Sequence, residues 1–246
     1  MTTTSVLVVG ASLGGLTVVE ALRREGFSGS VTLLGAERHL PYDRPPLSKR
    51  VLLSAMEPSQ TQLRPQSTLD QLHAELVLSD PAVCLDASRH EVKTASGRVM
   101  AADVIVLATG LVPRKLSGQD GLSGVYVLRT LDDALALKSA LVPGKKLVVV
   151  GDGVLGTEIA ATACSLGLAV TLVGPQSLPM RSQLGPLVGS CLGTLHSLRG
   201  VNLRLGTGVA SLRSDSSVVT GVCLQSGEEL SADLVVVAMG SLPATD

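Results

Sequence analysis

The chain has almost no aromatic side chains: its 246 residues include one phenylalanine, two tyrosines and no tryptophan. A hydrophobic core must therefore be built from valine, leucine, isoleucine and alanine, the residues of buried parallel strands. There is no basic run and no aromatic platform, and the formal net charge is −1, which argues against nucleic acid as a partner. The longest apolar runs, such as 104–108 and 234–239, are too short to span a bilayer.

Cysteine is also scarce. The four cysteines are widely spaced and form no Cys-x-x-Cys pair, which argues against a metal centre or a disulfide framework. We interpret Cys84, Cys164, Cys191 and Cys223 as small buried hydrophobes and expect no bound metal. No positively charged segment precedes an apolar one at the N-terminus, so we expect no signal peptide and a cytoplasmic location.

One pattern occurs twice along the chain. An apolar β-branched run at 5–9 meets a glycine-rich turn at 10–15, and a helical pattern then leads to a buried strand at 31–34. In the second copy the strand, turn, helix and second strand fall at 146–150, 151–156, 161–166 and 170–173. The order strand, glycine-rich turn, helix, strand is typical of the right-handed βαβ unit.

Each copy also has a later closing strand, at 102–110 and at 232–240, and these two segments resemble each other. We therefore predict an α/β fold of two tandem Rossmann-like dinucleotide-binding domains with mainly parallel sheets. The first domain is expected at 1–111 and takes back 241–246, and the second is expected at 112–240.

The first glycine-rich turn has the chemistry of a pyrophosphate site. Gly10 permits the tight turn, while Gly14 and Gly15 allow close approach of the phosphates and of the helix to the sheet. The N-terminus of the helix presents free N–H groups and the positive end of its dipole. Ser12 stands where the strict fingerprint has its middle glycine. The alternative is a turn without a ligand, which the flanking strand and helix and the second copy make less favoured.

The second turn has the strict form, with Gly151, Gly153 and Gly156, but Gly174 stands where an acid is expected to bind a ribose hydroxyl. The loss of that acid predicts that NADPH is tolerated beside NADH. Arg181 is a candidate for the 2′-phosphate, and the alternative is an ordinary surface arginine. A βαβ unit that packs but binds nothing is the other interpretation of this segment.

The segment 41–49, with sequence PYDRPPLSK, is predicted to be a rigid, proline-braced loop that holds Lys49 in place. The alternative is a solvent-exposed proline-rich loop without a function. No cysteine lies between Gly15 and Lys49.

Together with 10–15, 108–114, 128–133 and 151–158, the segment 41–49 resembles the flavin-dependent ferredoxin reductases. These enzymes use NAD(P)H to reduce small iron–sulfur proteins, and the resemblance covers nearly the whole chain. It implies FAD and either NADH or NADPH as cofactors, and a ferredoxin-like iron–sulfur carrier as partner. It also implies that 1–111 binds FAD and that 112–240 binds NAD(P).

The resemblance implies that Lys49 and Glu158 are the catalytic residues, which lie near the flavin ring and pair across the domain boundary. Without it, Glu158 is an exposed helix carboxylate and Arg129 a surface arginine. The implied cofactor-binding residues are Gly10, Ser12, Gly14, Gly15, Glu37, Arg44, Pro45, Lys49, Ala82, Ala108, Thr109, Gly110, Arg129, Gly151, Gly153, Val154, Leu155, Gly156, Gly174, Arg181 and Gly240.

The chain departs from this family at three places. The acid expected after Gly35 stands one position later, at Glu37, and Gly174 replaces the second acid. The chain stops at Asp246, whereas the family continues with a Gly-Asp pair that grips the flavin and with an interface domain. The alternative function is therefore a truncated, non-catalytic remnant that binds dinucleotides without turnover.

From this we predict that the 246-residue chain holds FAD weakly. Several lost contacts at roughly 1 kcal/mol each would weaken the affinity by orders of magnitude. Flavin absorbance of the protein after gel filtration measures this, and stoichiometric FAD that survives the column would contradict the prediction.

Overall fold

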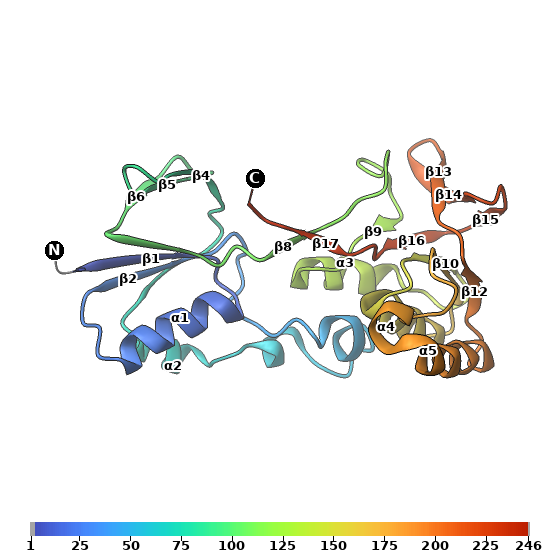
Figure 1. The fold of residues 1–246 in the computed structure, drawn as a ribbon, viewed down its shortest axis with the longest axis horizontal. Coiled ribbons are helices and arrows are strands. Elements are labelled where there is room, and N and C mark those ends of the chain that lie inside the picture. Colours follow the sequence, from blue (N-terminus) through green and yellow to red (C-terminus); the bar gives the residue numbers. More distant parts are fainter. Residues whose placement is uncertain (1–2, 246) are drawn as a thin grey trace. The chain divides into compact units, whose positions relative to one another are not determined.

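The computed structural model describes residues 3–245, and the contacts among residues divide the chain into two units (Figure 1). The first unit comprises Met1–Asp43, Ser59–Leu111 and Pro243–Asp246, and the second comprises Arg44–Pro58 and Val112–Leu242. Residues 44–58, which the sequence placed with the first domain, thus group with the second. The physical reason is that the short π-helix η1 (Leu47–Val51) packs on helices α3 (Leu131–Ala140) and α4 (Val154–Ser165).

The first unit contains a four-stranded parallel sheet in the order β3-β2-β1-β7. Its strands are β1 (Ser5–Val9), β2 (Ser30–Leu34), β3 (Glu75–Val77) and β7 (Val104–Leu107). A second, antiparallel sheet comprises β4 (Ala82–Asp86), β5 (Glu91–Thr94) and β6 (Val99–Ala101). The helical segments are α1 (Leu13–Arg24), η2 (Pro58–Thr61) and α2 (Gln66–Gln71).

Strand β1 is buried on both faces, which explains its uninterrupted apolar sequence. Val6 and Val8 pack against Val19 of α1, whereas Leu7 and Val9 face Leu34 and its neighbours on the opposite side. The edge strand β7 differs, because its Val104 and Leu107 are exposed.

The second unit repeats this design with a five-stranded parallel sheet in the order β12-β11-β10-β16-β9. Its strands are β9 (Val125–Tyr126), β10 (Lys146–Val150), β11 (Ala169–Gly174), β12 (Asn202–Leu205) and β16 (Leu234–Val237). Because the chain steps from β10 through α4 to β11 and through α5 (Arg181–Leu198) to β12 in one direction, right-handed crossovers place α4 and α5 on the same face.

The antiparallel sheet of β13 (Val209–Asp215), β14 (Val218–Leu224) and β15 (Glu229–Ser231) packs on the parallel sheet of this unit through Val219, Val222 and Leu224. The two short strands β8 (Leu111–Pro113) and β17 (Ser241–Pro243) pair with each other.

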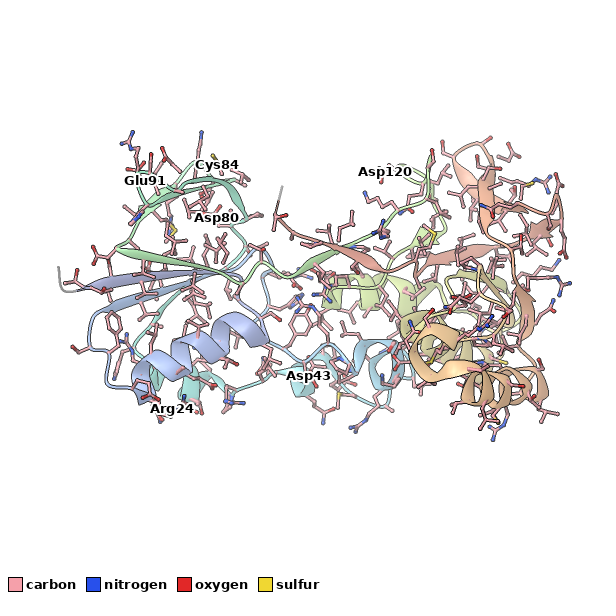
Figure 2. The ribbon with its side chains drawn as sticks, viewed as in Figure 1. Arg24, Asp43, Asp80, Cys84, Glu91 and Asp120 are labelled. Atoms are coloured by element: carbon pink, nitrogen blue, oxygen red, sulfur yellow. The ribbon has the colours of Figure 1, made fainter. Side chains whose placement is uncertain are left out.

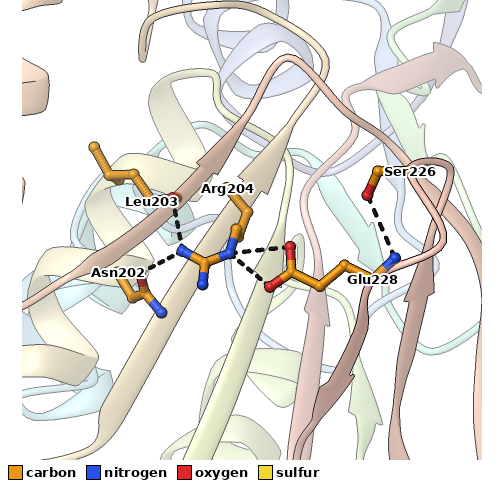
Figure 3. Close-up of polar contacts among 5 residues, drawn as sticks. All are labelled: Asn202, Leu203, Arg204, Ser226 and Glu228. Atoms are coloured by element: carbon orange, nitrogen blue, oxygen red, sulfur yellow. Dashed lines mark hydrogen bonds and ion pairs between the residues drawn. The ribbon is translucent and has the colours of Figure 1, made fainter.

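Arg204 ties the edge strand β12 to the turn before β15 (Figure 3). Its Nε donates to both carboxylate oxygens of Glu228, at 2.8 and 3.1 Å, and its Nη1 donates to Asn202 Oδ1 at 2.7 Å. A charged side chain that is already paired at a sheet edge hinders the addition of a foreign strand.

The predicted α/β class with mainly parallel sheets is confirmed, and the strands expected at 5–9 and 146–150 have those bounds. Two expectations are wrong. Lys49 lies in the helical turn η1 and not in a loop. None of the cysteines is fully buried: Cys84, on β4 (Figure 2), and Cys191 are exposed, Cys164 and Cys223 are half-buried, and all four are free thiols. All five residues of β4 are exposed, so Cys84 cannot be part of a core, and on α5 the buried residues are Gly189, Gly193 and His196 and not Cys191.

Within residues 3–245 there is no helix that combines the length and the apolar character needed to cross a membrane.

Asp103 and Asp233 perform the same task in the two units. Asp103 Oδ2 accepts hydrogen bonds from the backbone N–H groups of Thr4 and Ser5, at 2.7 and 3.0 Å. Asp233 Oδ2 accepts from the backbone N–H of Lys146 at 2.7 Å. Each carboxylate thus fastens the start of the closing strand to the start of the first strand. The hydrogen bonds from Thr4 and Ser5 lower the pKa of Asp103 from 3.8 to about 2.

This pKa predicts acid-dependent stability. Because the folded state depresses the pKa of Asp103, the stabilisation is present above the unfolded value of 3.8 and is lost as the pH falls through about 2. Asp103→Asn should therefore reduce the free energy of unfolding more at about pH 6 than at about pH 2. Urea unfolding followed by circular dichroism measures the free energy of unfolding of the wild type and the variant at each pH. An equal loss of stability at the two pH values would contradict the prediction.

Candidate dinucleotide sites

The two glycine-rich turns have the same geometry. Gly10 and Gly151 have φ angles of +121° and +127°, in the region that favours glycine. A Cβ on either residue would lie only 2.1 or 2.2 Å from the carbonyl oxygen of Ala108 or Ala238. Glycine is thus required at both positions because the turn passes directly over the end of the closing strand.

The helices that follow approach these turns equally closely. A Cβ on Gly15 or Gly156 would meet the carbonyl oxygen of Gly10 or Gly151 at 1.9 or 1.8 Å. Gly14 is exposed, and a Cβ at this position would meet no atom nearer than 3.9 Å. The surface above the first helical turn is thus open, as a bound pyrophosphate requires.

Ser12 is the N-cap of α1 and Gly153 is the N-cap of α4. Ser12 has φ −125° and ψ −164°, an extended conformation that any residue can adopt. The departure from the strict fingerprint at Ser12 therefore causes no backbone strain. The exposed side chains of Leu13 and Val154 hold the same position in the two helices, as the first residue after the cap.

The remaining candidates of the first unit lie around the ends of its strands. Glu37 follows β2, and its Oε2 accepts a hydrogen bond of 2.6 Å from the hydroxyl of Tyr42, which is buried. Thr109 donates to the carbonyl of Ala244 at 2.6 Å, and Gly110, which follows it, has φ +78°. Ala82 begins the antiparallel strand β4 and is exposed.

In the second unit, Lys49 and Glu158 form an ion pair of 2.8 Å between Nζ and Oε1. This confirms the predicted pairing, but both residues belong to the same unit, so the expectation that the pair bridges two units is wrong. The reason is that η1 packs on α4.

Ser48 completes this junction and was missed by the sequence reasoning. Its buried hydroxyl donates to Glu158 Oε2 at 2.5 Å, while its carbonyl accepts from Thr162 Oγ1 at 2.8 Å. The two carboxylate oxygens of Glu158 are thus divided between Ser48 and Lys49. The signal in the sequence was a small polar residue directly before Lys49.

A second junction brings Arg44 to Arg129. Arg44 Nε donates to the carbonyl of Arg129 at 3.2 Å. The backbone N–H of Arg129 donates in turn to Asp133, which forms a capping box with Thr130 at the start of α3. The cap holds Arg129 just before the N-terminal end of α3. Pro45 continues from Arg44 towards η1.

At the end of β11, the space beside Gly174 is occupied by the carboxylate of Asp152, which lies 2.3 Å from the point where a Cβ on Gly174 would stand. Asp152 is buried, and its two oxygens accept from the backbone and side-chain N–H groups of Gln176 at 2.8 and 3.0 Å. An acid therefore does stand at this strand end, although it comes from the glycine-rich turn. The sequence reasoning missed Asp152 and Gln176 because it looked only at the position after the strand.

The other candidates of the second unit surround this turn. Arg181 begins α5 and donates to Ser177 Oγ at 2.8 Å, and Leu155 lies in the first turn of α4. Gly240 follows β16 with φ +83°, the counterpart of Gly110. Among residues 3–245, no three histidine, cysteine, aspartate or glutamate side chains gather in a way that could hold a metal ion.

The Ser48 hydroxyl should contribute to stability through its bond to a carboxylate. Because hydrogen bonds to charged groups are worth about 1.5–3 kcal/mol, Ser48→Ala should lower the free energy of unfolding by a similar amount. Urea unfolding measures the loss. The control is Ser165→Ala, an exposed serine of α4 that bonds only to the carbonyl of Thr162, and its loss should be below about 0.5 kcal/mol. Equal losses in the two variants would argue against this role of Ser48.

The sequence of the chain is similar to those of known proteins over nearly its whole length. The pyridine nucleotide-disulphide oxidoreductase family matches residues 4–246. Rhodocoxin reductase of Rhodococcus erythropolis is 36% identical over 240 residues, which is 97% of this chain and 56% of that protein. The ferredoxin–NAD(+) reductase component of the p-cumate 2,3-dioxygenase system of Pseudomonas putida is 36% identical over 239 residues, 97% of this chain and 58% of that protein.

Solved structures agree with these matches. The covalent putidaredoxin reductase–putidaredoxin complex superposes with a TM-score of 0.92 at 32% identity, over 98% of this chain and 59% of that chain. A ferredoxin reductase of Rhodopseudomonas palustris gives 0.92 at 36% identity, over 98% and 60%. The chain therefore spans somewhat more than half the length of these relatives. Its two matching glycine-rich turns and the match over residues 4–246 show that the chain belongs to the pyridine nucleotide-disulphide oxidoreductase family.

Proposed function

We propose that the chain functions in a flavin-dependent oxidoreductase that passes electrons from NADH or NADPH through FAD to a ferredoxin-type iron–sulfur protein. The observation that carries the proposal is the presence of two dinucleotide turns of equal geometry in one chain, at Gly10 and Gly151. Electron transfer from a nicotinamide dinucleotide to a flavin dinucleotide needs a binding site for each of them. The relatives are named as ferredoxin and rhodocoxin reductases, which supports a ferredoxin-type protein as the final electron acceptor.

We assign FAD to the first unit. The open first turn of α1 above Gly14 would receive the pyrophosphate, with Ser12 and Gly15 beside it. Glu37, held by Tyr42, is proposed to accept a hydrogen bond from the ribose of FAD. Ala82 and the segment 108–110 are the further proposed contacts of this unit.

We assign the nicotinamide dinucleotide to the second unit. The turn at 151–156 would receive its pyrophosphate in the same way, with Val154 and Leu155 at the start of α4. Gly240 is a further proposed contact of this unit, the counterpart of Gly110 in the first, and both residues have positive φ angles.

Lys49 and Glu158 are proposed as the catalytic residues, and Arg44, Pro45 and Arg129 as further cofactor-binding residues. When bound, the nicotinamide supplies a hydride and the flavin supplies single electrons to the iron–sulfur protein. The role of the chain is then to orient the rings and to place charge near them. The ammonium group of Lys49 would stabilise negative charge on the ring, and Glu158 with Ser48 would hold that ammonium group in position. A cytoplasmic location remains a prediction from the sequence.

Lys49→Met tests the proposal. The protein supplied with FAD should oxidise NADH with ferricyanide as acceptor, and Lys49→Met should slow the reduction of the flavin about tenfold or more, equivalent to about 1.4 kcal/mol at the transition state. The matched control is Lys93→Met, an exposed lysine of β5, which should retain the wild-type rate. Stopped-flow absorbance follows the flavin. A colourless protein that neither takes up FAD nor oxidises NADH would favour the non-catalytic alternative.

We also propose that NADPH is accepted beside NADH. Asp152 stands at the end of β11, but both of its oxygens are engaged by Gln176 and it is buried, so it does not act as the exposed acid that repels a 2′-phosphate. The ratio of kcat/KM for the two nucleotides measures the preference, and Arg181→Gln should lower the value for NADPH alone. A preference for NADH above about a hundredfold, worth about 2.7 kcal/mol, would contradict relaxed specificity.

A further inference from the structure

A pocket of about 360 Å³ lies in the second unit between the last turns of α4 and α5. Cys164, Leu192, Leu195, His196, Arg199 and Val201 are among the residues that line it. The glycine-rich turn lies at the opposite, N-terminal end of α4, so the pocket is separate from the proposed nicotinamide site. Nothing in the proposed electron route uses these residues.

His196 is the unusual member of this pocket. It belongs to the inner face of α5 with Gly189 and Gly193, and only 6% of its surface is exposed. Among residues 3–245 its imidazole has no hydrogen-bond or ionic partner. No buried side-chain nitrogen or oxygen in the described structure is both sealed from solvent and unpaired, so the ring nitrogens of His196 are accessible to solvent, and His196 lines the pocket. A ligand that fills the pocket would displace water from these nitrogens and would have to pair with them, because a polar group that is buried without a partner is costly.

The protonation state of His196 limits the class of ligand that the pocket can bind. Burial lowers the pKa of His196 below its usual range, so the ring is neutral near pH 7 and offers one N–H donor and one acceptor. Cys164 is already engaged, because its Sγ donates to the carbonyl of Arg199 at 3.0 Å and fastens α4 to the end of α5. One neutral histidine beside an engaged thiol is not a metal site.

Two further features give the pocket its character. Leu192, Leu195 and Val201 provide apolar walls. Arg199 is exposed and also lines the pocket, and within the described residues its guanidinium forms no hydrogen bond or ion pair. The pocket thus combines an apolar surface, a neutral N–H group and a single unpaired cation, and its volume is in the range of sites for small organic ligands.

From these features we infer that the pocket binds a small monocarboxylic acid with an apolar body. Its carboxylate would accept hydrogen bonds from Arg199 and from the N–H of His196, and its hydrocarbon part would cover Leu192, Leu195 and Val201. A single cation does not match a dicarboxylate or a polyphosphate. This inference does not depend on the proposed electron transfer.

Octanoate is the probe, and the four histidines of the chain make the readout specific. In ¹H–¹³C spectra of the histidine-labelled 246-residue protein, octanoate should shift the ring signal of His196 in a saturable way and leave those of His39, His73 and His90 in place. Single substitutions of these three residues assign the spectrum by elimination, so the assignment does not require a folded His196 variant.

Two comparisons test the carboxylate. Arg199→Gln should weaken octanoate about tenfold or more, the effect of losing a charge-assisted hydrogen bond. The control is Arg213→Gln, which removes an exposed arginine of β13 that pairs with Glu229. This variant should bind octanoate as the wild type does. Octanol has the same hydrocarbon tail without the charge. Its affinity for the wild type should be no higher than the affinity of octanoate for Arg199→Gln.

Three results would overturn the inference. The first is that His196 does not shift at millimolar octanoate. The second is that all four histidines shift alike, which indicates adsorption without a site. The third is that octanol binds as tightly as octanoate and Arg199→Gln binds normally, which indicates an apolar surface that does not recognise a carboxylate.

Discussion

In both units the chain passes so closely over the end of a neighbouring strand that a single methyl group would not fit. At Gly10 and at Gly151, an added Cβ would lie 2.1 and 2.2 Å from a carbonyl oxygen of the closing strand. The helix behind each turn approaches the turn itself just as closely, at Gly15 and Gly156. These contacts set the position of the first helical turn relative to the sheet, and every proposed phosphate contact depends on that position.

The sheets supply the rigidity that such close contacts need. The first strand of each unit pairs in parallel with strands on both sides and is buried on both faces, so its end cannot move independently. Asp103 and Asp233 fasten the opposite ends of the same strand pairs. Each unit thus has a polar clamp where the first strand begins and a glycine turn where it ends, and a dinucleotide site lies at the open, carboxyl end of a sheet of this kind.

Two carboxylates near the glycine-rich turn of the second unit, Glu158 and Asp152, have different partners. At Glu158, one carboxylate oxygen meets Lys49 and the other meets the buried hydroxyl of Ser48, which holds the ion pair in one arrangement at a partly exposed surface. At Asp152, both oxygens are engaged by Gln176 and the group is buried, so this carboxylate stabilises the loop after β11. Two acids near one site therefore have different roles, and their hydrogen-bond partners distinguish them.

The sequence by itself determined the α/β class, the two βαβ units and the positions of both turns, because these depend on local patterns: an apolar run, glycines at fixed spacing and a following helix. It also predicted the pairing of Lys49 with Glu158, through the family resemblance. Only the tertiary structure decided that residues 44–58 group with the second unit, that Lys49 lies in a helical turn, and that Asp152 occupies the space beside Gly174. The same holds for the exposure of the cysteines and for the open face of His196. These features arise from contacts between residues far apart in the chain, and periodicity and motif spacing carry no information about which side chains meet there.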